Sequence, residues 1–204
     1  MGLLSSSVSI TRYRVDGQPA DPIIEAVESG LKQNTIYEID NEETDKAVGW
    51  TAFDTPYRPM FEGSSFIIGP HFVFSLRIDK KSISAKIVNK HHAIEMAKKL
   101  AESRREYLSK EEKKLIKDAV VHALHRRIPA TPNLYDVLWK YEARELWFFS
   151  NQKAANEALE SLFSKSFKLN LIRLFPYTAA TLTAGLSDSQ VDSLSTLSPV
   201  GFTE

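Results

Sequence analysis

The chain has no cysteine, no net charge and no long hydrophobic run. Without cysteine there is no disulfide framework, no thiolate metal site and no cysteine nucleophile, which is compatible with a reducing compartment. No apolar run approaches the roughly 20 residues needed to cross a bilayer. The N-terminus lacks the basic region and long apolar stretch of an export signal. We therefore expect a cytoplasmic protein that does not contact the membrane.

The even balance of 26 basic and 26 acidic side chains conceals a strong separation of charge. Residues 77–127 contain fifteen Lys or Arg against seven Asp or Glu, a local balance of +8. Residues 1–76 balance at −6 and residues 128–204 at −2. Because phosphate binding depends on local charge, the basic segment predicts a polyanion site. The alternative is a helical surface that is merely solvated.

Period-two hydrophobic patterns in the first part of the chain predict an antiparallel sheet. Gly69 and Pro70 lie between two apolar runs and predict a tight turn there. A short helix is expected over residues 23–32, where apolar residues recur on one face. Strands are expected over residues 8–15, 49–53, 66–68, 72–78 and 82–88.

From about residue 90 the period changes to 3.6, which is typical of helices. Residues 94–108 follow this spacing. Ser109 begins a second helix that runs to about residue 126, because its hydroxyl can cap the helix while Glu112 bonds back to the cap amide. The expected buried face of this second helix consists of apolar residues: Leu115, Ala119 and Ala123, with the neighbouring Ile116, Val120 and Leu124.

After Pro129 and Pro132 the pattern returns to strands. It predicts a hairpin over residues 134–141 and 146–149, an amphipathic helix from residue 151, and a last strand over residues 169–175. The predicted fold class is α+β, with antiparallel sheets packed with two central basic helices and one later amphipathic helix. We expect one domain over residues 1–176, a small helical lobe at 90–127, and a C-terminal tail at 177–204 with a short helix.

Polar clusters give little support for catalysis. His91 and Glu95 lie one helical turn apart and could place two metal ligands on one face, but the sequence indicates no third or fourth ligand. The acidic pairs Glu42-Glu43 and Glu111-Glu112 could be nuclease carboxylates, yet adjacent side chains point apart. There is no glycine-rich phosphate loop and no Gly-x-Ser-x-Gly motif. We expect no catalytic residues, no metal, no cofactor and no enzyme activity.

Aromatic side chains beside a basic surface can stack unpaired bases. Most of the aromatic residues on the predicted strands are expected in the core, because one sheet face must pack against the helices. Binding to the duplex backbone therefore fits better than stacking of single strands. The candidates for stacking are Phe72, Phe74, Trp139, Trp147 and Phe148.

The basic segment also contains an extended motif, Leu108-x-Lys110-x-Glu112-Lys113-x-x-Ile116-Lys117-Asp118-x-Val120-x-His122-x-Leu124-x-x-Arg127. It is similar to the central signature of the bacterial recombination-associated RdgC family. Tyr13-Arg14-Val15, Gly49-Trp50 and Trp139 resemble other strands of that family, in the same order, so that the likeness spans roughly residues 8–176. The chain departs from the family at Arg126-Arg127-Ile128-Pro129, where the family has Pro-Arg-Ala-Phe, and at Glu106, where a basic residue is expected.

The resemblance implies an α+β protein that binds DNA, in particular double-stranded DNA, without sequence preference. It also implies a homodimer that forms a ring around the duplex, association with the nucleoid, and restraint of a RecA-type recombinase. Family members commonly continue further, so we expect a shortened member that lacks the usual C-terminal segment.

Two hypotheses follow from these observations. The first is a sequence-independent DNA-binding protein that modulates homologous recombination or replication. The alternative is a non-catalytic protein-interaction or self-association module that has lost DNA affinity, with its basic helices docked on an acidic surface. Under the first hypothesis the phosphate contacts are Lys98, Lys99, Arg104, Arg105, Lys110, Lys113, Lys114, Lys117, Arg126 and Arg127.

Overall fold

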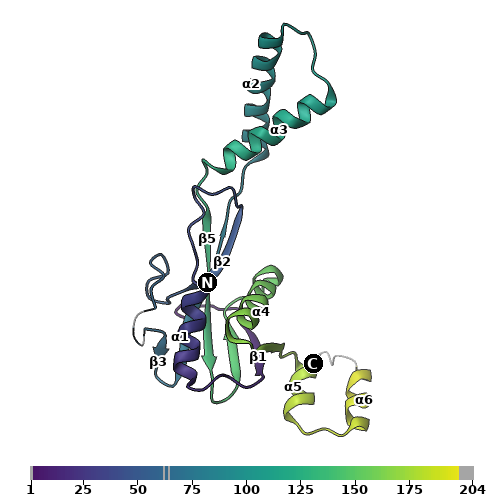
Figure 1. Ribbon diagram of the computed structural model, residues 1–204. Helices are drawn as coiled ribbons and strands as arrows, with labels where there is room; N and C mark the ends of the chain where they lie inside the picture. Colours follow the sequence, from purple (N-terminus) through teal and green to yellow (C-terminus); the bar gives the residue numbers. More distant parts are fainter. Residues whose placement is uncertain (1, 62, 64, 198–204) are drawn as a thin grey trace.

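A computed structural model describes residues 2–61, 63 and 65–197, and in these residues the chain forms a seven-stranded antiparallel sheet with helices (Figure 1). The strand order is β2-β4-β5-β6-β1-β7, and β3 pairs with β4. The α+β class predicted from the sequence is confirmed. The strands are β1 (Thr11–Asp16), β2 (Lys46–Thr51), β3 (Ile67–Ile68), β4 (His71–Lys80), β5 (Thr131–Lys140), β6 (Glu145–Phe148) and β7 (Asn170–Arg173).

The main core lies on one face of this sheet. Apolar side chains at alternate positions of β4, from Phe72 to Ile78, are buried there, because alternate residues of a strand point to the same face of the sheet. Trp139 on β5 packs edge-on against Phe72, with ring centroids 5.5 Å apart. These aromatic contacts join neighbouring strands and fix their register, which pairs Phe72 with Trp139.

Two helices, α1 (Ile23–Gln33) and α4 (Lys153–Phe167), cover this core and pack against each other. At their contact, Gly30 lies so close to Phe167 that an added Cβ would be 2.7 Å from the ring. Trp50 on β2 donates a hydrogen bond from Nε1 to Ser166 Oγ at 2.8 Å. The amphipathic helix predicted from residue 151 is confirmed, with Ala155, Leu159, Leu162 and Phe163 buried.

The opposite face of β4 carries polar side chains that are also buried. Arg77 donates two hydrogen bonds to Asp79, at 2.8 and 2.6 Å, and one to Glu38 at 2.9 Å. Burial lowers the pKa of Arg77, but its bonds to Asp79 and Glu38 outweigh this and raise the pKa above its usual value. Burial of a charged group is costly unless the group is paired and hydrogen-bonded, and Arg77 and Asp79 meet both conditions.

The strands β4 and β5 extend beyond the main core and support a helical hairpin at their far end (Figure 1). With ten residues each, they are about 34 Å long. The hairpin consists of α2 (Ala85–Ser103) and α3 (Lys110–His125). The strand expected over residues 82–88 is wrong, because α2 begins at Ala85. The alternating sequence there is overridden by packing of Val88 against α3.

The described part of the chain closes with two short helices, α5 (Pro176–Thr183) and α6 (Asp188–Thr196), on the side of the sheet that faces away from the hairpin (Figure 1). The short helix predicted near Ser187 corresponds to α6, whereas α5 was not predicted. Residues 198–204 of the expected tail lie outside the described residues. Within the described residues, no helix has the length and apolar character that crossing a membrane requires.

Candidate nucleic-acid interface

The tip of the hairpin is shaped by Arg104 and by a capping box at Ser109. Arg104 ends α2 in the left-handed conformation, with φ of 49°, which reverses the chain. Ser109 Oγ accepts a hydrogen bond from the Glu112 amide at 3.2 Å, and the Ser109 amide donates to Glu112 Oε2 at 2.9 Å. The predicted capping box is therefore confirmed, and it fixes where α3 begins.

Glu112 also binds one of the candidate DNA contacts. Arg105 donates a hydrogen bond from Nη2 to Glu112 Oε1 at 2.6 Å. This bond, and then the bond from the Ser109 amide, lowers the pKa of Glu112 to about 2. The Arg105 charge is thus engaged within the tip, while the neighbouring Arg104 is exposed and has no acidic partner among the described residues.

The two helices meet through a narrow apolar contact. Val88 on α2 packs against Val120 and Leu124 on α3, and partly buried residues such as Ile116 border them. Val120 and Leu124 were correctly predicted to be buried. Because only one helix packs against α3, a single row of side chains is covered. Ile116, also predicted to be buried, is partly buried, whereas the prediction is wrong for Leu115, Ala119 and Ala123, which the structure exposes.

The basic candidates all lie on the surface of the hairpin or at its base, and each of the ten side chains is exposed. Four of them form one group on α3, which we call the lysine stripe: Lys110, Lys113, Lys114 and Lys117. Their spacing of three, four and seven residues places them on one side of the helix. No described carboxylate forms an ion pair with any member of the stripe, so their four charges face solvent.

Three of the ten candidates are paired with carboxylates of the same chain. Lys98 lies 2.7 Å from Glu95, Arg105 is held by Glu112, and Arg126 binds Glu43. The structure therefore separates engaged cations from cations with no ion pair among the described residues. The second group contains Lys99, Arg104, Arg127 and the lysine stripe.

An acidic segment over residues 40–45 is brought to the base of α3, which the sequence did not predict. Glu43 binds Arg126 and also lies 3.1 Å from His122 Nε2. The Arg126 bond, and then the nearby His122, lower the pKa of Glu43 despite the opposing effect of desolvation. Asp40 accepts a hydrogen bond from the Ala130 amide at 2.7 Å. This segment neutralises charge where the hairpin joins the sheet.

Lys81 is a second residue that sequence reasoning missed. It is 3 % exposed, and its Nζ donates to the carbonyl oxygens of Asp40, Glu42 and His125, at 3.0, 2.7 and 2.7 Å. It thereby links the acidic segment to the C-terminal end of α3, where carbonyl groups lack helical partners. The alternation of β4 could have indicated its burial, because Lys81 lies two residues after Asp79 and four after Arg77, on the same buried polar face.

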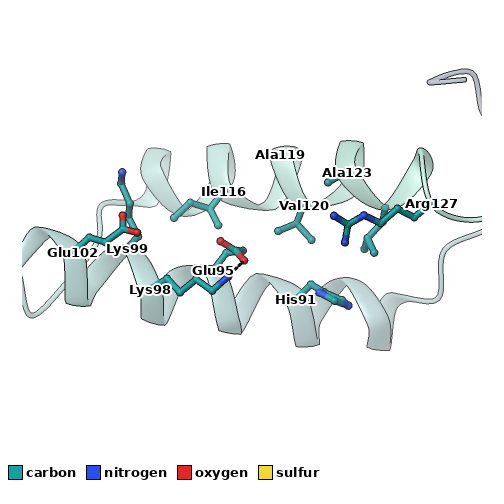
Figure 2. Close-up of a pocket in the computed structure, with 11 residues that line it drawn as sticks. His91, Glu95, Lys98, Lys99, Glu102, Ile116, Ala119, Val120, Ala123 and Arg127 are labelled. Carbon is teal, nitrogen blue, oxygen red and sulfur yellow. Dashed lines mark hydrogen bonds and ion pairs between the residues drawn. The ribbon is translucent and has the colours of Figure 1, made fainter. Parts of the chain in front are cut away.

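A groove of about 350 Å³ opens between α2 and α3 on another side of the hairpin (Figure 2). Apolar residues of α3, including Ile116 and Val120, line it together with charged residues of α2. Lys98 and Lys99 lie on the α2 wall, and Arg127 lies at the far end of α3. The groove and the lysine stripe are thus separate surfaces of the same hairpin.

The residues weighed as metal ligands are not brought together. His91 lines the groove, and Glu95 pairs with Lys98 instead of with a second ligand. His92 Nε2 lies 3.0 Å from the Lys113 carbonyl oxygen. In the part of the chain that the structure describes, no three His, Cys, Asp or Glu side chains lie together as a metal would require.

The aromatic residues weighed as base-stacking candidates are almost all in the core. Phe72, Phe74, Trp139 and Phe148 are at most 2 % exposed, as expected. Trp147 is half-buried, and Lys140 Nζ lies 3.9 Å from the centre of its ring. None of the five lies on the hairpin that carries the lysine stripe.

Comparison with known protein families gives a match over residues 9–197 to a family described as "Putative exonuclease, RdgC". The chain belongs to the RdgC family. Membership of this recombination-associated family supports a role in recombination. No curated protein matches the chain. The matched region includes the sheet, the hairpin and both C-terminal helices.

Proposed function

We propose that this RdgC-family chain binds duplex DNA through the phosphate backbone, with the lysine stripe as the principal contact. The observation that carries the proposal is the set of four exposed lysines on one side of α3 with no ion pair among the described residues. Release of counterions from phosphate is the main source of sequence-independent affinity, and unpaired surface lysines are suited to it.

The shape of the molecule supports this role. The hairpin projects from the sheet on β4 and β5, so its surface can approach a duplex without obstruction by the main body (Figure 1). From Lys110 to Lys117 the stripe spans about 10 Å along α3, which suits neighbouring phosphates of one backbone. Arg104, at the end of α2, is a further exposed cation at the tip of the hairpin. Contacts of this type position a protein on DNA without reading bases.

We further propose that binding restrains a RecA-type recombinase by covering the duplex, and that the chain acts as a homodimer around it. The family's printed description names an exonuclease. Our proposal is instead a non-catalytic one, since a protein that covers DNA needs affinity and not hydrolysis. End-labelled duplex incubated with the protein and Mg²⁺ is expected to keep its length, and progressive shortening would show a nuclease.

The direct test compares duplexes of unrelated sequence bound by the chain and by Lys113→Ala/Lys114→Ala. We expect the double variant to weaken binding to every duplex by the same factor, because phosphate contacts are sequence-independent. The matched control is Lys165→Ala/Lys168→Ala, which removes the same charge from exposed positions on α4 and at its end. Equal affinities for the two double variants, or no binding at low salt, would refute the proposal.

A protein-interaction module is the second candidate function, and the open groove between α2 and α3 favours it. Ile94 on α2 is 42 % exposed and Leu115 on α3 is 68 % exposed, so the hairpin presents apolar as well as basic surface. Exposed apolar surface with a polar rim is typical of protein contacts. A chain that binds no duplex at low salt but self-associates would support this candidate instead.

A further inference from the structure

Strand β2 forms one edge of the sheet, since it pairs with β4 on one side and stands first in the strand order. Successive residues of an edge strand direct their backbone amide and carbonyl groups alternately towards the neighbouring strand and away from it. The Asp45 carbonyl oxygen accepts a hydrogen bond from the Lys81 amide, on the β4 side. The amide and carbonyl groups of Lys46 and Val48 therefore point away from β4, to the open side of the edge.

The chain itself pairs with this open side at a single residue. The Trp50 amide donates a hydrogen bond to the Asn34 carbonyl oxygen, and the Ile36 amide donates one to the Trp50 carbonyl oxygen, each at 2.9 Å. The corresponding groups of Lys46 and Val48 have no hydrogen-bond partner among the described residues. The edge thus already accepts an extended backbone at Trp50, and it offers the same groups at two further residues.

A cleft of about 430 Å³ lies between these residues of β2 and the helix α4, and we call it the edge cleft. Its floor is apolar, because Val48 and Leu162 pack on the main core there. The α4 wall carries the small residues Ala154, Ala158 and Ser161, which leave space above the floor. A segment paired with β2 would direct every second side chain to the same side as Val48, into this cleft.

The charges of the edge cleft favour a segment that carries carboxylates. Lys46 and Lys165 line the cleft and form no ion pair with a described carboxylate, whereas the lining residue Glu157 lies 3.9 Å from Lys153 on α4. The acid is thus partly neutralised by its own helix, and two cations remain for a ligand. A second copy of β2 fits less well, because pairing of two identical edges would set their Lys46 side chains against each other.

We propose that β2 binds an extended peptide segment of another protein by strand addition, with an apolar side chain in the edge cleft and a carboxylate beside Lys46 or Lys165. In this mode of recognition the backbone hydrogen bonds give affinity, and pockets for alternate side chains give specificity. The edge cleft shares no residue with the lysine stripe or with the groove on the hairpin. The inference therefore goes beyond duplex binding and does not depend on it.

Selection of short random peptides on the full chain, followed by titration of the selected peptides by fluorescence polarisation, tests the proposal. The selected peptides are expected to have apolar residues at alternate positions and at least one carboxylate. N-methylation of their amides, one at a time, then tests the backbone contact. It is expected to weaken binding about five-fold at alternate amides and little at the amides between them, because only alternate N–H groups face β2.

Two variants of the chain locate the site. Lys46→Pro removes the outward amide of β2 and leaves the bonds to β4, since proline is accepted at the first residue of an edge strand. Its matched control, Lys46→Ala, removes the same charge and keeps the amide. Ser161→Arg fills the edge cleft from α4, and its matched control, Ser29→Arg, makes the same change at an exposed serine of α1.

Lys46→Pro and Ser161→Arg are each expected to weaken peptide binding about five-fold or more relative to their controls, while duplex affinity stays unchanged in all four variants. Circular dichroism checks that the variants are folded, and Ser161→Arg tests the site independently of any change in β2. Failure to select a peptide, equal affinities within both pairs, or N-methylation effects without alternation would overturn the proposal. Sedimentation that shows a dimer lost in Lys46→Pro and kept in Lys46→Ala would make a second copy the occupant, and would overturn it as well.

Discussion

Lys81→Met is the substitution that tests most sharply how the hairpin is held on the sheet. Lys81 is buried, and its ammonium group joins the acidic segment to the end of α3 through three carbonyl oxygens, at 3.0, 2.7 and 2.7 Å. Methionine retains most of the apolar stem but donates no hydrogen bond. The substitution therefore removes the link while it preserves the packing around it.

The expected loss follows from the number and exposure of these acceptors. A hydrogen bond from a charged donor contributes about 1.5–3 kcal/mol net. Asp40 and Glu42 are exposed, so water can replace part of the loss at their carbonyl groups. We therefore expect the free energy of unfolding to fall by about 3 kcal/mol and not by the sum of three bonds. For a chain of this size that corresponds to a decrease in Tm of about 6–12 °C.

Circular dichroism during thermal unfolding measures this change, and hydrogen exchange of the α3 amides locates it. The matched control is Lys80→Met, which removes the same charge from the adjacent, exposed position. The control is expected to unfold close to the unmodified chain. If Lys81→Met and Lys80→Met have the same Tm and the same α3 protection, Lys81 does not hold the hairpin.

Three further outcomes are expected. Glu43→Gln frees Arg126 and should tighten duplex binding about two- to five-fold. The control Glu42→Gln removes an exposed carboxylate with no ion pair among the described residues, and it should change duplex binding less. Equal effects of the two substitutions in a binding titration would contradict this prediction. Ser109→Ala should cost about 1 kcal/mol and increase hydrogen exchange in the first turn of α3, an effect that the loop substitution Ser82→Ala should not share. The pKa of Glu112 is about 2 in the folded chain and about 4.3 when unfolded, so the stabilisation by its ionised form is present above pH 4.3 and is lost as pH falls towards 2. Acid unfolding followed by circular dichroism should therefore differ between the unmodified chain and Glu112→Gln. Identical unfolding curves would show that Glu112 does not contribute to acid sensitivity.

Much of the fold could be predicted because local chemistry and tertiary packing agree. The capping box at Ser109 fixes the start of α3 from two residues alone, and it forms as predicted. The alternating aromatic residues of β4 likewise face the core. In both cases the conformation favoured by the local sequence is also the one favoured by tertiary packing.

The wrong predictions have physical causes that lie outside the local sequence pattern. Residues 82–88 alternate as a strand does, but Val88 gains its burial by packing on α3, which requires a helix. Adjacent apolar pairs such as Leu115-Ile116 do not reveal which member is buried, because that depends on how many helices pack against α3. The contact between Glu43 and Arg126 joins residues 83 positions apart, and no local signal indicates it.

The salt dependence of duplex binding tests the role of the lysine stripe most directly. A variant with all four stripe lysines changed to alanine is compared with a control that loses four exposed lysines from the main body: Lys32, Lys153, Lys165 and Lys168. If each stripe lysine neutralises one phosphate, the slope of log affinity against log salt should become shallower by about 3.6 per chain in the stripe variant. The control should change little, although it loses the same total charge. Equal slopes in the two variants would contradict the stripe as the DNA contact.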